Sequence, residues 1–265
     1  MFLPGFFRAA WPGPFAGWPL VLAALNLAIA GCATLGARPA LSPPEISTTL
    51  AQLKDQRDRV TSFYSMGTVM LKRWVVESEQ ANILVVGTKD PFRLKVEVTH
   101  PWGGPILHVL LEGDRLRAFS FQESTLYTGP ATQEALGVFL PSPPDLPSIW
   151  SVLRGYPPLP ERGSIAAGPG PRIVWTGEGG DPLETLELLP ESLAPARVLF
   201  HGSGLEVSFE DMQEKEGVLY AGEVRLKPGN GGQVVIHNQR MVFNTDIPEK
   251  VFRLRIPDTH HEVYL

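Results

Sequence analysis

Residues 92–98 read Phe-Arg-Leu-Lys-Val-Glu-Val, with apolar and charged side chains in strict alternation. Successive side chains of a β-strand point to opposite faces, so this pattern is typical of a strand with one buried and one solvated face. In the second half of the chain, a strand predicted at 204–210 shows the same alternation in Leu-Glu-Val-Ser-Phe-Glu, residues 205–210. The sequence therefore predicts that both halves contribute to a β-sheet.

Similar strand patterns cover most of the remaining chain. They occur at 64–74, 81–88, 105–112, 115–121, 124–128, 172–176, 183–189, 196–201, 218–227, 233–237 and 251–256. Short links such as Glu112-Gly113-Asp114 join them, and such links connect antiparallel strands, because a parallel return needs a crossover of about a dozen residues. A sheet of that many strands curls rather than staying flat. We expect a mainly β protein with a strongly bent antiparallel sheet.

Three segments have helical spacing instead. The first begins near Pro44, with Ser47 and Thr48 as candidate N-caps. Its apolar stripe consists of Ile46, Leu50, Leu53 and Val60. Two short helices are predicted at 131–140 and 146–153, on either side of a proline-rich hinge. Helices with one apolar face are predicted to cover one face of the sheet.

The N-terminal segment carries the pattern of a bacterial lipoprotein. An apolar run from Leu20 ends in Ile29-Ala30-Gly31-Cys32, where small residues precede a cysteine that can carry a diacylglycerol. Cys32 is the only cysteine, so it cannot form an intramolecular disulfide. We expect residues 1–31 to be a lipoprotein signal peptide, 32–44 to be the lipidated Cys32 and a flexible tether, and 45–265 to be one folded domain.

A membrane-spanning helix is the alternative for this segment. The run from Val21 to Gly31 is too short to cross about 30 Å of hydrocarbon at 1.5 Å per residue, and Pro19 and Asn26 interrupt it. Ala33 follows the cysteine where an aspartate would favour retention in the inner membrane. The expected location is the outer membrane, facing the periplasm.

Charge and motifs exclude several classes of function. Lys and Arg number 23 and Asp and Glu 28, for a net charge of −5, which argues against nucleic acid as a partner. The sequence has no Gly-x-Ser-x-Gly elbow, His-Glu-x-x-His motif or phosphate loop, and no cofactor is expected. In His260-His261-Glu262, adjacent strand residues point to opposite faces, so we expect a surface pair rather than a metal site. We expect a protein that is not an enzyme.

Several segments, in this order, resemble outer-membrane lipoprotein receptors of the LolB type and, more distantly, LolA-like periplasmic carriers. They are Ser65-Met66-Gly67-Thr68, the strand at 92–98 with His100-Pro101-Trp102-Gly103-Gly104 after it, Tyr127-Thr128-Gly129-Pro130-Ala131, Leu140-Pro141 and 149–157. The resemblance runs from about Val60 to Pro158 and more loosely to Ile256. Trp102 departs from the leucine that the receptor family usually shows, and beyond Pro160 only the strand pattern matches.

The resemblance implies a bent, unclosed antiparallel β-barrel of about 11 strands with a short helical lid over an apolar cavity. Members of the family receive the acyl chains of lipoproteins from a soluble carrier and release them into the outer membrane. We therefore expect a protein that takes acyl chains of lipoproteins, or other lipids, from a LolA-like carrier and helps insert them in that membrane. The alternative is a structural or assembly lipoprotein of the same fold that docks a protein partner without lipid transfer. An enzyme acting on lipid or glycan ranks third.

Two sets of residues are candidates for function. In Pro101-Trp102-Gly103-Gly104-Pro105, Trp102 and Gly103 form a candidate membrane-insertion loop, because tryptophan prefers the membrane interface. The alternative is a tryptophan folded back onto the sheet. The candidate lipid-cavity residues, each of which also fits an ordinary core, are Met66, Val96, Val98, Leu107, Val109, Leu136, Phe139, Trp150 and Phe209.

Overall fold

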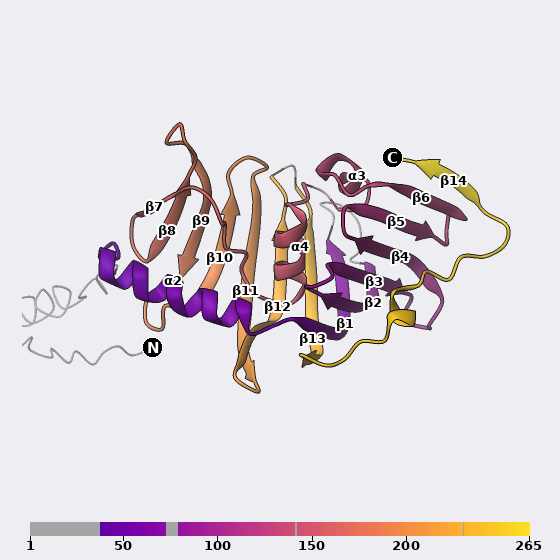
Figure 1. Cartoon of the computed structure of the whole chain (residues 1–265), viewed down its shortest axis with the longest axis horizontal. Coiled ribbons are helices and arrows are strands. Elements are labelled where there is room, and N and C mark those ends of the chain that lie inside the picture. Colours follow the sequence, from indigo (N-terminus) through magenta and orange to yellow (C-terminus); the bar gives the residue numbers. More distant parts are fainter. Residues whose placement is uncertain (1–37, 73–78, 141, 230) are drawn as a thin grey trace, which may run out of the picture. The chain divides into compact units, whose positions relative to one another are not determined.

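The computed structural model describes residues 38–72, 79–140, 142–229 and 231–265. The predicted signal peptide and Cys32 lie outside these residues. From Pro39 to Leu265 the chain forms one compact unit, built on a single sheet of 14 strands (Figure 1).

The strands follow one another in the sheet almost in sequence order. The first six are β1 (Ser62–Lys72), β2 (Glu79–Thr88), β3 (Arg93–Thr99), β4 (Pro105–Glu112), β5 (Arg115–Ser120) and β6 (Thr125–Pro130). The others are β7 (Ser164–Ala167), β8 (Arg172–Thr176), β9 (Pro182–Leu188), β10 (Pro195–Phe200), β11 (Leu205–Lys215), β12 (Val218–Lys227), β13 (Gln233–Phe243) and β14 (His261–Tyr264). The order β14-β6-β5-β4-β3-β2-β1-β13-β12-β11-β10-β9-β8-β7 leaves β14 and β7 as edges. The sheet is therefore unclosed, as expected.

The number of strands was predicted wrongly: the sheet has 14 strands and not about 11. The edge strands β7 and β14 were missed because all four residues of each are exposed, so neither shows the alternation of a half-buried strand. β14 also pairs parallel to β6, against the antiparallel expectation. The strand predicted at 251–256 is instead the end of a 3₁₀ helix, η1 (Glu249–Phe252), followed by a segment outside the sheet.

Three helices are described: α2 (Pro43–Asp58), α3 (Gln133–Gly137) and α4 (Leu146–Leu153). The first begins at Pro43, next to the expected start at Pro44, but its N-cap is Ser42 and not Ser47 or Thr48. The Glu45 carboxylate accepts a hydrogen bond of 2.8 Å from the backbone N–H of Ser42. Leu50 and Leu53 are buried, as the apolar stripe predicted. In Figure 1, α2 crosses the strands on the same side of the sheet as α4.

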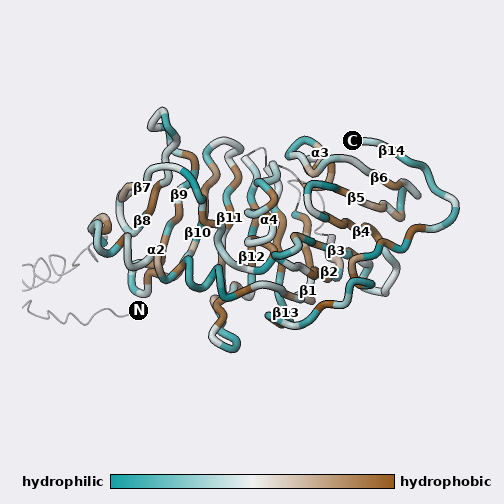
Figure 2. Tube along the Cα trace, in the orientation of Figure 1, coloured by the Kyte–Doolittle hydropathy of each residue, from teal (hydrophilic) through white to brown (hydrophobic). Residues whose placement is uncertain are grey.

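We call the sheet face under α4 the inner face and the opposite one the outer face. On the inner face Phe63 lies opposite Gly87, and the ring of Trp150 from α4 packs edge-on against Phe63 at 5.2 Å. A Cβ atom on Gly87 would lie 2.5 Å from the Phe63 ring, so only glycine allows this close packing. Figure 2 shows hydrophobic and hydrophilic residues alternating along the strands.

Candidate functional site

The inner face is buried at one end of β3 and β4 and partly open at the other. Leu94 and Leu111 lie opposite each other and are 1% and 3% exposed. Further along the same two strands, Val96 lies opposite Val109 and then Val98 opposite Leu107, and all four are only partly buried. The apolar surface of the sheet therefore extends beyond the part that is fully covered.

Strand β2 lies between β3 and β1, with its inner-face residue Ile83 6% exposed, and β1 beyond it carries two further apolar residues on the same face. Val69 is partly buried and Leu71 is 44% exposed, and both alternate in phase with the inner-face residue Phe63. We call these six residues the open inner patch: Val69, Leu71, Val96, Val98, Leu107 and Val109. These partly exposed apolar side chains are a candidate binding surface for apolar groups, since covering them is favourable.

The turn between β3 and β4 lies at the open end, next to Val98 and Leu107. Backbone hydrogen bonds from His100 N–H to the Gly104 carbonyl, 2.7 Å, and from Gly103 N–H to the His100 carbonyl, 2.8 Å, close this turn. Gly103 has φ +96°, a conformation that favours glycine. The side chain of Trp102 is 79% exposed, so the structure places it in solvent and not against the sheet.

The predicted cavity residues fall into three groups. Leu136, Trp150 and Phe209 are buried in the main core, whereas Val96, Leu107, Val109 and Phe139 are partly buried and pack against it. Val98 is also partly buried. Met66 is separate from both groups. It alternates with the inner-face residues Ser65 and Gly67, so it lies on the outer face, 43% exposed.

The described residues leave the interior under α4 packed. Phe63, Leu94 and Trp150 fill the space there and are all buried. Four cavities in the described part of the chain have volumes of about 260 to 710 Å³, and Phe209 is the one predicted cavity residue that lines any of these four. The surface that remains available to an apolar ligand on β1, β3 and β4 is the open inner patch.

Sequence comparisons give no relatives: no protein-family model matches the chain, and no curated protein matches it significantly. Solved structures do match. A LolA superfamily protein from Nitrosomonas europaea is similar with a TM-score of 0.50 and 14% identity, over 78% of this chain and 97% of that chain. A DUF1329 family protein from Desulfovibrio piger is similar with a TM-score of 0.53 and 12% identity, over 80% and 98%. The chain has a LolA/LolB-type fold.

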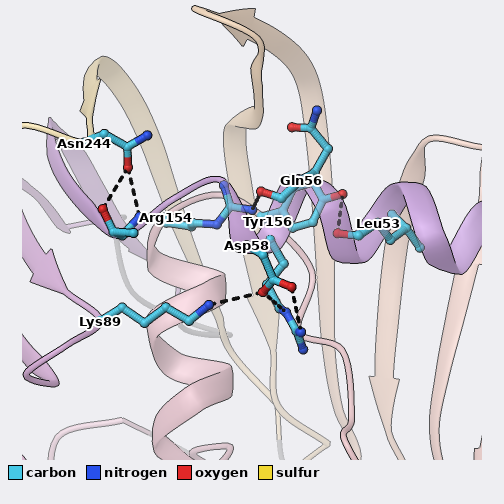
Figure 3. A network of polar contacts seen from close by, with 9 residues as sticks. Leu53, Gln56, Asp58, Lys89, Arg154, Tyr156 and Asn244 are labelled. Carbon is cyan, nitrogen blue, oxygen red and sulfur yellow. Dashed lines mark hydrogen bonds and ion pairs between the residues drawn. The ribbon is translucent and has the colours of Figure 1, made fainter.

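In this LolA/LolB-type fold a buried arginine, which sequence reasoning missed, joins two helices to the sheet. Arg154, at the end of α4, is fully buried (Figure 3). Its guanidinium donates to the carbonyl of Gln56 on α2 at 3.3 Å and to that of Leu219 on β12 at 3.5 Å, and it lies 4.2 Å from the centre of the Tyr156 ring. Burial lowers the pKa of Arg154 to about 10, so the group stays charged at neutral pH.

A second missed group is a carboxyl on the inner face of the LolA/LolB-type sheet. Glu184 lies on β9 opposite Trp175 and Phe200, and its Oε2 is buried without a hydrogen-bond partner among the described residues. Burial, with a smaller contribution from Asp145, raises the pKa of Glu184 to about 7. The signal was present in the sequence, because Glu184 alternates in phase with Leu186, an inner-face residue.

The described residues contain no group of three or more His, Cys, Asp or Glu side chains arranged to hold a metal ion. His260 Nε2 lies 3.3 Å from Glu262 Oε1, and its Nδ1 lies 2.8 Å from the Pro257 carbonyl. In the same part of the chain, none of the helices has both the length and the apolar character to span a bilayer.

Proposed function

We propose that this protein is an outer-membrane lipoprotein, anchored through Cys32 and facing the periplasm, that binds acyl chains of lipoproteins or other lipids. It receives them from a LolA-like carrier and helps insert them in the membrane. The observation that carries the proposal is the continuity of the open inner patch with the exposed Trp102 turn. The LolA/LolB-type fold supports it.

The energetics of such a transfer need no nucleotide or cofactor. Each CH₂ group that leaves water contributes about 0.8 kcal/mol, so partial coverage of a long acyl chain is enough for binding. The patch is open to solvent along one side, which lets a chain enter and leave without unfolding of the α4 contacts. Trp102 stands at the same end, where an indole ring can enter the interface of a bilayer.

The expected path of the lipid follows from this arrangement. A chain on Val98 and Leu107 lies next to the Trp102 turn, since these are the inner-face residues closest to it on β3 and β4. Insertion of the turn would bring the patch to the membrane surface. The final step is downhill, because a bilayer covers an acyl chain more completely than a half-open patch does.

The test compares two leucines whose side chains are exposed to nearly the same extent. Leu71, in the patch, is 44% exposed, and Leu183, on β9, is 46% exposed. A fluorescent fatty acid is titrated into Leu71→Asp and Leu183→Asp. We expect Leu71→Asp to weaken binding about tenfold, because a carboxylate must be desolvated by the chain, while Leu183→Asp binds as the wild type does. Equal binding by all three proteins would contradict the proposal.

A second candidate function is the docking of a protein partner by a structural or assembly lipoprotein. It is favoured by the core under α4, where Leu94, Leu111 and Trp150 are all buried. In that case the open inner patch covers a side chain or helix of the partner instead of an acyl chain. The fatty acid would then bind none of the three proteins measurably.

A further inference from the structure

The C-terminal segment covers part of the outer face. Residues 247–255, which we call the strap, follow β13 and pack Phe252 against Val86 and Leu110. Lys95 of β3 fixes the strap, since its Nζ donates to the carbonyls of Val251 at 2.8 Å and Arg253 at 3.0 Å. The strap is thus held to the sheet by apolar packing and by a buried lysine.

A cavity of about 710 Å³ lies between the strap and the outer face. Its floor includes Leu84 and Val86 of β2. Its ionisable lining consists of Lys95, Glu97, His108, Lys250, Arg253 and Arg255. Four basic side chains thus face one carboxylate, in a chain whose net charge is −5.

The single carboxylate of the cavity is already paired. Glu97 Oε1 lies 2.7 Å from Lys95 Nζ, so these two charges balance each other. For Lys250, Arg253 and Arg255, the described part of the chain supplies no hydrogen bond or ion pair to the side chain. Three exposed cations of the cavity lining therefore have no ion-pair partner among the described residues, which gives this site a local excess of positive charge.

Three other cavities of the described part show no comparable excess of positive charge. The one beside β10 and β11 is lined by Arg197 with three carboxylates, and the one beside β5 and β6 by two arginines with two carboxylates. The cavity under α2 has two cations and one carboxylate. The positive charge of the strap cavity is a local feature of the fold.

The wall of the strap cavity also contains a polar group without a partner. His108 of β4 is only 8% exposed, and its Nδ1 makes no hydrogen bond with any described residue. Burial lowers the pKa of His108, so the ring is neutral at neutral pH. Buried polar atoms are normally paired, and one that is left over in a charged cavity is available to a ligand or to ordered water.

We infer that the strap cavity binds a phosphate-bearing anion, held by Arg253, Arg255 and Lys250. Arginine binds phosphate oxygens through two parallel N–H donors, and lysine adds a point charge. The same chemistry is offered by free phosphate and by the headgroup of an anionic phospholipid. This site is on the opposite face of the sheet from the open inner patch and does not depend on acyl-chain binding.

The test uses the full-length protein in a neutral detergent, with ¹³C-labelled histidine rings observed by NMR. Inorganic phosphate is titrated in one arm. In the other arm, phosphatidylglycerol or phosphatidylcholine with the same acyl chains is added to the micelles. We expect the His108 resonance to shift on saturation, while that of His201, whose Nε2 lies 2.9 Å from Thr185 Oγ1 on another strand, stays in place.

The double variant Arg253→Gln/Arg255→Gln should weaken the response at least tenfold. The matched control, Arg162→Gln/Lys227→Gln, removes two exposed cations outside the cavity and should leave the response unchanged. A shift with inorganic phosphate supports a free anion as ligand, and a shift with phosphatidylglycerol alone supports a lipid headgroup. No shift in either arm, or an equal shift in the double variant, would overturn the inference.

Discussion

The imidazole of His100 and the indole of Trp102 are stacked, with ring centroids 4.4 Å apart and ring planes 7° from parallel. The turn that carries them is closed by two backbone hydrogen bonds and by Gly103. The stack covers part of one face of the indole, and Trp102 is still 79% exposed. An apolar ring is thereby held in water at the open end of the inner face.

We predict that Trp102→Glu abolishes binding of the folded domain to liposomes and leaves its melting temperature nearly unchanged. Glutamate loses the interfacial burial of the ring and adds the cost of desolvating a charge, while an exposed position contributes within about 0.5 kcal/mol to stability. Liposome flotation and thermal unfolding measure the two effects. Trp102→Phe is the control and should retain most of the binding. Undiminished flotation of Trp102→Glu would exclude insertion of this turn.

Lipid attachment at Cys32 gives a direct labelling experiment. Radiolabelled palmitate should enter the wild-type protein in cells, and Cys32→Ser should remove the label, since no other cysteine is present. Cys32→Ser should also accumulate with its signal peptide uncleaved. Labelling that persists in this variant would show that the lipid is attached elsewhere.

Glu184 makes stability depend on pH. Its pKa is about 7 in the folded protein against 4.5 for an unperturbed glutamate, so between these values the folded state binds more protons than the unfolded state. The free energy of unfolding therefore falls as pH rises through this window, by about 2 kcal/mol. In Glu184→Gln this part of the pH dependence should vanish. Urea unfolding at pH 5 and pH 8 measures it, and an equal drop in both proteins would refute the assignment.

Arg154 should be important for stability through its carbonyl partners rather than through charge pairing. Arg154→Ala leaves the carbonyls of Gln56 and Leu219 without their donor and opens a cavity, so we expect a loss of about 3 kcal/mol. Arg154→Met fills the space without a buried charge and should lose at least ~1 kcal/mol less. Urea unfolding measures the stability of both variants. If Arg154 does not contribute to stability, neither variant will differ from the wild type.

Much of the fold was predictable because alternation reports burial directly. Residues 92–98 and 205–210 form β3 and β11 as their patterns predicted, and the short links made the main sheet antiparallel. The edge strand β14 was not predictable in this way, since exposed strands have no apolar face. Residues 251–256 gave a false strand because apolar side chains of the strap also pack on the sheet, while Lys95 takes its carbonyls.

The candidate site was predictable only in part. Trp102 stands out in sequence by its glycine and proline neighbours, but its exposure depends on the hydrogen bonds of the turn. Met66 was predicted to line the cavity, but it lies on the outer face. It is next to the inner-face residue Gly67, and neighbouring residues of a strand face opposite sides of the sheet. Gly67 itself lies at a bulge between β1 and β13, where a Cβ atom would be 1.8 Å from the His237 carbonyl oxygen. These two strands are neighbours in the sheet but far apart in the sequence, so no local sequence pattern shows this contact.

Binding of an acyl chain by the open inner patch can be tested by finding where such a chain lies on the protein. A triacylated lipopeptide with a photoreactive group in one chain is incubated with the full-length protein, and the crosslinked residues are mapped by mass spectrometry. We expect labels on the ends of β1, β3 and β4 around Leu71, Val98 and Leu107, and their loss in Leu71→Asp. Labels confined to the outer face, or no label above that of a protein without the fold, would contradict it.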